Sequence, residues 1–242
     1  MSELKRIRIF ISSPGDVEQE RLISERVIKR LYERYNHAID IEGVFWEHEP
    51  LRATDSYQVQ ITPPSQTDIA VCILWSRLGT RLPSDITRPD GSHYNSGTEF
   101  EFEDAFLSKQ AKGTPDLLVY RKTQDPVVSL SDETRLMESM RQKKALDKFI
   151  NKWFHGSDGS LIAAFHPFES TARFEELLET HLNKLIEEKL SDAGLPLRPG
   201  QSKNAVKVAK WKGSPYRGLE TFEEEHAEIF FGRTQALSLI HI

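Results

Sequence analysis

The 242-residue chain lacks several features that define large classes of protein. It has a single cysteine, Cys72, which cannot form an internal disulfide and is expected in the core. The longest uninterrupted apolar run, 69–75, spans seven residues, far fewer than the roughly 20 of a membrane-spanning helix. The N-terminal residues show no signal-peptide pattern. These absences favour a cytoplasmic protein without a membrane segment.

Motifs of the common enzyme classes are also missing. The chain has no GxxxxGK[ST] phosphate-binding loop, no GxSxG nucleophile turn and no HExxH zinc motif. Its eight histidines are scattered without metal-ligand spacing, so we expect no metal site. With 32 basic and 37 acidic residues the net charge is −5, which gives no general electrostatic reason to expect nucleic acid as a partner. Any basic patch would have to be local.

What the chain does contain is an alternation of strand-like and helix-like segments. The predicted strands cover residues 6–12, 38–46, 68–75, 116–121 and 160–165, and the predicted helices cover 13–36, 54–61, 98–109, 131–154 and 170–191. This order predicts an α/β fold with a five-stranded parallel sheet and helices on both faces. The most apolar strand, 68–75, is expected at the centre of the sheet. Ligands of such folds bind beyond the carboxyl ends of the strands.

The composition changes after residue 191. Residues 192–213 are rich in glycine, proline and lysine, which is typical of a solvated linker, although the lysines could contact an anionic partner. Residues 214–242 are too few to fold alone. The sequence therefore predicts a domain over 1–191, a linker over 192–213 and the beginning of a second domain over 214–242.

Carboxylates gather at the start of the helix expected at 98–109. Glu99, Glu101 and Glu103 occupy alternate positions, so on a helix Glu99 and Glu103 share a face from which Glu101 is turned away. Such a carboxylate can serve catalysis. Acidic residues also favour a helix N-terminus through the helix dipole alone, and the pattern by itself leaves both interpretations open.

Three short blocks resemble bacterial TIR-like domains that form a family of unknown function. They are residues 9–17 (IFISSPGDV) followed by Glu20-Arg21, residues 77–79 (RLG) and residues 98–105 (TEFEFEDA). The resemblance covers about residues 5–190 and implies a flavodoxin-like fold. In TIR enzymes that cleave NAD+, the catalytic glutamate is followed by an apolar residue and, four positions on, by alanine. Only Glu101 matches that pattern here, so the resemblance implies that Glu101 is catalytic.

The implied chemistry needs neither a metal nor a cofactor, because NAD+ is the substrate. Cleavage of the nicotinamide glycosidic bond develops oxocarbenium character on the ribose, which a carboxylate stabilises, and the leaving group is neutral. Ser13, Pro14 and Asp16 match a helix N-cap, first position and capping box, and amides there could receive phosphate. Trp46 could stack on a ring or belong to the core, and Arg77 could pair with phosphate or be solvated. The residues expected to contact the substrate are Ser12, Ser13, Gly15, Trp46, Arg77, Gly79 and Glu99.

A second resemblance lies near the end of the chain. Residues 214–222 (SPYRGLETF) and 230–233 (FFGR) look like the start of STAND-type signalling NTPases. This implies a bacterial defence protein that forms homo-oligomers in response to an unknown trigger, with ATP or GTP bound only in the NTPase domain farther along. Two alternatives stay open for residues 1–191: a non-catalytic TIR-like association module, and an enzyme similar to nucleoside deoxyribosyltransferases.

Overall fold

A computed structural model describes residues 5–48, 60–127, 131–156, 158 and 160–197. Its centre is a five-stranded sheet in the order β2-β1-β3-β4-β5, in which every neighbouring pair is parallel. The strands are β1 (Lys5–Ser12), β2 (Ile39–Val44), β3 (Ile69–Leu74), β4 (Asp116–Lys122) and β5 (His166–Phe168). This strand order is that of flavodoxin-like folds, so the predicted fold class is confirmed.

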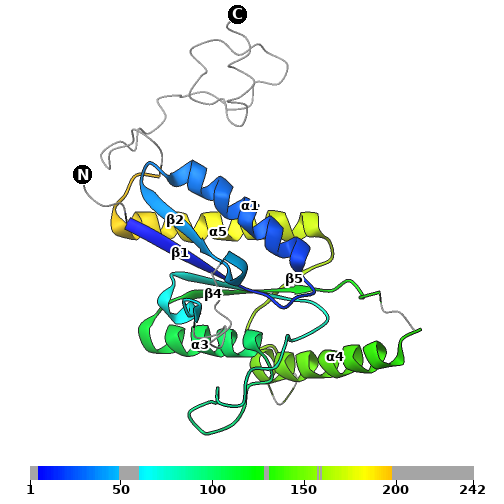
Figure 1. The fold of residues 1–242 in the computed structure, drawn as a ribbon. Helices are drawn as coiled ribbons and strands as arrows, with labels where there is room; N and C mark the ends of the chain where they lie inside the picture. The colour runs from blue at the N-terminus through cyan, green and yellow to red at the C-terminus, as the bar shows by residue number, and fades with distance from the viewer. Residues whose placement is uncertain (1–4, 49–59, 128–130, 157, 159, 198–242) are drawn as a thin grey trace, which may run out of the picture. The chain divides into compact units, whose positions relative to one another are not determined.

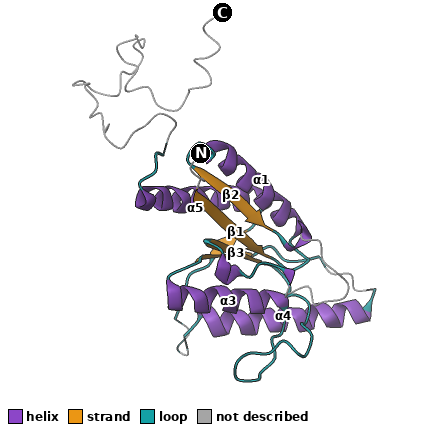
Figure 2. Ribbon diagram, turned by 60° about the vertical axis from the view of Figure 1, so that its left-hand side comes forward, coloured by secondary structure: helices purple, strands orange, loops and turns teal. Residues whose placement is uncertain are grey.

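Four helices cover the two faces of this sheet, as Figures 1 and 2 show. They are α1 (Glu18–Tyr35), α3 (Gly97–Lys112), α4 (Glu133–Phe154) and α5 (Thr171–Ala193). Helices α1 and α5 pack together on one face, where their apolar side chains share a core cluster with β1 and β3. Helices α3 and α4 share a second cluster on the other face. Two short 3-10 helices, η1 (Trp46–His48) and η2 (Pro64–Gln66), lie in the connections.

Strand β3 occupies the centre of the sheet, as its composition predicted. All six of its residues are buried, because neighbouring strands flank it on both edges and helices cover both faces. Cys72 lies in this strand and is buried, in agreement with the expected core position.

The fifth strand was predicted in the wrong place. The apolar segment 160–165 lies outside the sheet, and Leu161 and Ile162 are 61% and 63% exposed. The strand is instead His166–Phe168, which pairs with Tyr120–Lys122 at the end of β4. Backbone pairing with β4 and burial of Phe168 therefore outweigh the stronger strand propensity of the preceding residues.

The start of the first helix was also predicted too early. Helix α1 begins at Glu18, and its N-cap residue Val17 provides no side-chain cap. Ser13 and Asp16 bind elsewhere: the Ser13 hydroxyl accepts a hydrogen bond from Arg21 Nε at 2.9 Å, and Asp16 Oδ2 accepts one from the Ser76 amide, also at 2.9 Å. Residues 13–16 thus form a turn at the end of β1 in place of the predicted capping box.

Three further predictions concern residues that lie outside the described part of the chain. The short helix predicted over 54–61 falls almost entirely outside them, as do the linker beyond 197 and the resemblance over 214–242. Helix α5 runs two residues into the predicted linker and ends at Gly194, whose φ is 70°. Within the described part of the chain, none of the helices combines the length and apolarity needed to cross a bilayer.

Candidate functional site

A cleft of about 240 Å³ opens at the carboxyl edge of the sheet, where ligands of such folds bind. Four segments build it: the turn after β1, the 3-10 helix η1, the segment after β3, and the first turns of α3. Its lining residues are Ser13, Pro14, Gly15, Trp46, Gly79, Thr80, Gly97, Thr98 and Glu101. Because these segments lie far apart in the sequence, the parallel sheet is what brings them together.

Glu101 supplies the carboxylate of this cleft. It lies in the second turn of α3, is 6% exposed, and its Oε2 accepts a hydrogen bond from the Ser12 hydroxyl at 2.6 Å. Burial and, to a lesser extent, the charge of the neighbouring Glu101 raise the pKa of the Cys72 thiol to about 12. The thiol therefore stays protonated at neutral pH.

The other two glutamates of the helix start face away from the cleft. Arg88 Nη2 lies 3.2 Å from Glu99 Oε1 and 2.7 Å from Glu103 Oε1, and Lys152 adds a second cation at 3.1 Å from Glu103. Burial opposes ionisation of Glu103, but its hydrogen bonds to these two cations outweigh burial and lower its pKa. The helical period thus separates a cleft-facing carboxylate from two that serve as ion-pair partners.

Arg21 holds two walls of the cleft together. Its Nε donates to Ser13 Oγ at 2.9 Å, and its Nη2 donates to the Pro14 carbonyl at 3.1 Å. The same guanidinium forms an ion pair with Glu47 and lies 5.6 Å from the ring centroid of Trp46. A single buried cation therefore positions both the turn after β1 and the 3-10 helix η1. Sequence reasoning noted Arg21 as part of a motif but assigned it no role.

The preceding residue of that motif, Glu20, stabilises the same edge of the sheet. Its Oε1 lies 2.9 Å from Lys122 Nζ at the end of β4, and both side chains are buried. Lys122 also lies 4.1 Å from the ring centroid of Trp75. Since β4 and α1 are distant in the sequence, the contact could not be read from the motif alone.

The structure brings most of the predicted contact residues together with Glu101. The cleft is lined by Ser13, Gly15, Trp46 and Gly79, and the Ser12 hydroxyl donates a hydrogen bond to the Glu101 carboxylate. Gly79 has a φ of 116°, and a Cβ there would lie 3.2 Å from Thr98 Oγ1, so this wall requires glycine both for its backbone and for its space.

Two predicted contact residues lie elsewhere. Glu99 faces Arg88 and Asn95, whose amide donates to Glu99 Oε2 at 2.6 Å. Arg77 lines a different cavity, on the α4 side of the segment after β3. In addition, the amides of residues 13–16 do not belong to a helix, because α1 begins only at Glu18. The helix-dipole argument for phosphate at those amides is therefore wrong.

No group of histidine, cysteine or acidic side chains arranged to hold a metal ion occurs among the described residues. The chemistry available in the cleft includes a buried carboxylate, a hydroxyl that donates to it, and an indole ring.

The fold and the cleft define a flavodoxin-like α/β domain in which one buried carboxylate, Glu101, lines a cleft at the carboxyl edge of the sheet. Residues 8–183 match the family model described as Domain of unknown function (DUF4062), and the chain belongs to this family. The match includes every residue that lines the cleft. No curated protein matches the chain.

Proposed function

We propose that residues 1–191 form a TIR-like effector domain that cleaves NAD+ at the nicotinamide glycosidic bond. The observation that carries the proposal is the position of Glu101. It is the one glutamate of the TEFEFEDA block that faces the cleft, and it is also the residue that the resemblance to TIR enzymes indicates as catalytic.

The reaction balances with groups that the cleft supplies. The bond between ribose C1′ and the nicotinamide nitrogen breaks, and its electron pair leaves with the nitrogen as neutral nicotinamide. Glu101 stabilises the positive charge that develops on the ribose. Water then adds to C1′ and releases a proton, so the products are nicotinamide and ADP-ribose.

The surroundings of Glu101 favour this role. A hydrogen bond from Ser12 would stabilise the ionised form of the carboxylate, and Trp46, which also lines the cleft, supplies an aromatic ring for contact with the nicotinamide. Because the cleft measures about 240 Å³, it is suited to the nicotinamide riboside half of the dinucleotide rather than to the whole molecule.

The same proposal includes regulation by clustering. The resemblance of residues 214–242 to the start of STAND NTPases suggests that oligomerisation of that module brings the TIR-like domains together. We therefore expect little activity from the dispersed chain and substantially more from the clustered one.

The experiment measures nicotinamide release by chromatography from the full chain, fused to a tag that allows controlled clustering. Glu101→Gln should lower the rate at least a hundredfold, because a transition-state charge contact is lost. Glu176→Gln is the control for loss of a carboxylate, since Glu176 lies on α5, is 66% exposed and is outside the lining of the cleft. Both variants are first shown to be folded by circular dichroism.

The outcomes separate the candidate functions. Absence of nicotinamide from folded, clustered wild-type protein would refute NAD+ cleavage and favour an association module. Glycosidic cleavage of deoxynucleosides, with NAD+ left intact, would identify the deoxyribosyltransferase-like alternative instead.

A further inference from the structure

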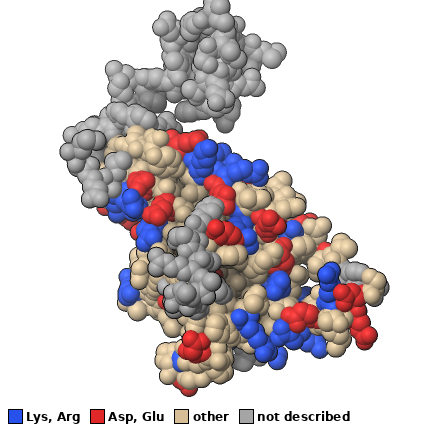
Figure 3. All heavy atoms as spheres, in the orientation of Figure 1, with Lys and Arg blue, Asp and Glu red and all other residues tan. Residues whose placement is uncertain are grey.

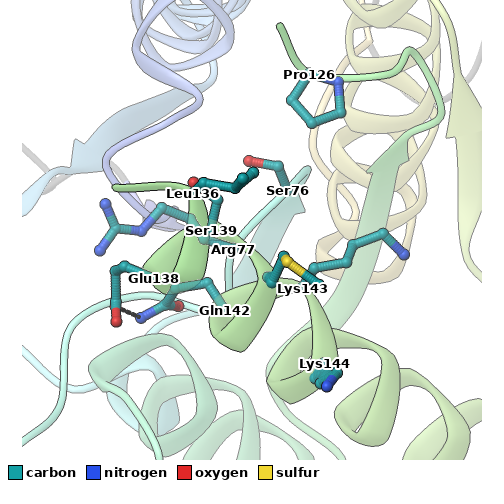
Figure 4. Close-up of a pocket in the computed structure, with 10 residues that line it drawn as sticks. Ser76, Arg77, Pro126, Leu136, Glu138, Ser139, Gln142, Lys143 and Lys144 are labelled. Carbon is teal, nitrogen blue, oxygen red and sulfur yellow. Dashed lines mark hydrogen bonds between the residues drawn. The ribbon is translucent and has the colours of Figure 1, made fainter. Parts of the chain in front are cut away.

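A second cavity of about 370 Å³ lies at the same edge of the sheet but on the side of α4 (Figure 4). The segment Ser76–Thr80 separates it from the Glu101 cleft: Ser76 and Arg77 line the second cavity, whereas Gly79 and Thr80 line the first. Residues of α4 and Pro126, which follows β4, complete its walls. The Glu101 chemistry makes no use of this cavity.

The two hydroxyl groups in the cavity present acceptor oxygens to a ligand. Ser76 Oγ donates its proton to Asp16 Oδ2 at 2.8 Å, and Ser139 Oγ donates to the Arg135 carbonyl at 2.9 Å. With their protons engaged elsewhere, both oxygens retain lone pairs for donors on a ligand. Hydroxyl or amino groups of a sugar or a base would satisfy them.

The cationic groups of the cavity favour an anionic ligand. Arg77 Nε is buried without a hydrogen-bond partner, an arrangement that is uncommon for a buried polar atom. The one carboxylate in the lining, Glu138, already accepts two hydrogen bonds from Arg141 at 2.7 Å each and one from Gln142 at 3.0 Å. Glu138 is therefore paired chiefly with Arg141, and it also interacts with the charge of Arg77.

Further positive charge surrounds the cavity. Lys143 and Lys144 lie in its lining, and Lys143 is paired with Asp147. Figure 3 shows basic side chains gathered over α4, interspersed with acidic ones. An adjoining pocket that shares Lys144 has six basic side chains in its lining and one acidic side chain, Glu99; the basic residues are Arg81, Arg88, Arg141, Lys144, Lys148 and Lys152. This is a local basic patch on a chain whose net charge is −5, and it would attract an anion to the cavity.

The rest of the lining is apolar. Leu136, Met140 and Pro126 provide hydrocarbon surface, and Met140 is 50% exposed. A planar ring laid against these side chains would remove them from water. The cavity thus combines an apolar wall, two acceptor hydroxyl oxygens and an incompletely satisfied guanidinium.

We propose that this second cavity binds a nucleoside monophosphate. The phosphate pairs with Arg77, the hydroxyls of Ser76 and Ser139 accept hydrogen bonds from the sugar or base, and the base lies on Leu136 and Met140. The site is separate from the Glu101 cleft, so it does not depend on NAD+ cleavage. Gln142 connects the two, because its Oε1 accepts a 3.4 Å hydrogen bond from the Gly79 amide.

The test is calorimetric titration of AMP into the full chain carrying Glu101→Gln, which removes the proposed cleavage chemistry. AMP should bind, and adenosine should bind at least tenfold more weakly because it lacks the phosphate that Arg77 pairs with. Arg77→Gln should weaken AMP binding at least tenfold. Arg173→Gln is the control, since Arg173 lies on α5, is 53% exposed and is outside the lining of this cavity and of the adjoining pocket, and it should change the affinity less than threefold.

A second variant, Met140→Asp, tests the proposal even if Arg77→Gln does not fold. Met140→Asp places a negative charge on the half-exposed apolar wall and should abolish AMP binding without loss of the fold. The proposal is overturned if the Glu101→Gln protein does not bind millimolar AMP, if adenosine binds as tightly as AMP, or if Arg77→Gln and Met140→Asp both leave the affinity unchanged. AMP binding that depends on Arg77, found together with no nicotinamide release from the folded, clustered wild-type chain, would support this site while refuting NAD+ cleavage.

Discussion

Replacement of Arg21 by methionine should destabilise the domain far more than loss of an ordinary surface arginine. The substitution keeps most of the length of the side chain but removes hydrogen bonds to Ser13 and Pro14 and the ion pair with Glu47. Removing one partner of a fully buried ion pair costs about 3–5 kcal/mol. The side chains of Arg21 and Glu47 are 10% and 25% exposed, so water can partly rehydrate Glu47. We therefore expect a loss of about 2–4 kcal/mol, including the two hydrogen bonds.

The assay is urea denaturation, compared through the free energy of unfolding in water. Arg30→Met is the matched control, because Arg30 lies on the same helix and binds Glu175 and Glu179 at 2.8 and 2.7 Å but is 39% exposed. Exposed pairs contribute about 0.2–1 kcal/mol each, so the control should lose about 1 kcal/mol. Combining Arg21→Met with Glu47→Gln should cost less than the sum of the single losses, because both changes remove the same ion pair. Equal losses for Arg21→Met and Arg30→Met would refute the argument that Arg21 holds the cleft.

Two other predictions concern stability. Gly79→Ala should destabilise the domain by about 1–3 kcal/mol, because φ is 116° and the new Cβ would lie 3.2 Å from Thr98 Oγ1. Gly113→Ala is the control, since its φ is 79° but nothing lies within 4 Å of the new Cβ. It should destabilise the domain less in the same thermal melts. Burial lowers the pKa values of His166 and His181 from 6.5, so the unfolded chain binds more protons near pH 6. Stability should consequently fall as the pH drops from 7 through the folded-state pKa values. A melting temperature that stays level between pH 7 and 5, or falls as steeply in a double His→Gln variant, would contradict this assignment.

The sheet could be predicted because its strands carry strong local signals. Strand β3 consists entirely of apolar residues and is buried throughout. Strand β5 is only three residues long and contains a proline, so its composition gave little signal. Its position depends on pairing with the end of β4, which lies more than 40 residues earlier in the sequence.

The site was predictable where it depended on helical periodicity. The alternation of Glu99, Glu101 and Glu103 correctly separated one carboxylate from the other two. The sequence could not predict that Arg77 lines the second cavity and not the Glu101 cleft. A loop after a strand has no regular period from which the direction of a side chain can be inferred. The function of Arg21 was equally hidden, since its partners belong to a turn and a 3-10 helix that only the folded sheet brings near α1.

The two paired glutamates explain how the cleft keeps its shape around the third. Arg88 belongs to the long connection between β3 and α3, and its pairs with Glu99 and Glu103 attach that connection to α3. The Gly97 amide donates to the Thr80 carbonyl at 3.2 Å, so the start of the same connection also touches the helix start. With both contacts in place, Gly79 and Thr80 are held against the turn of α3 that presents Glu101. The acidic block therefore serves two purposes. Glu99 and Glu103 attach the connection to α3 through Arg88, and Glu101 between them places a carboxylate in the cleft.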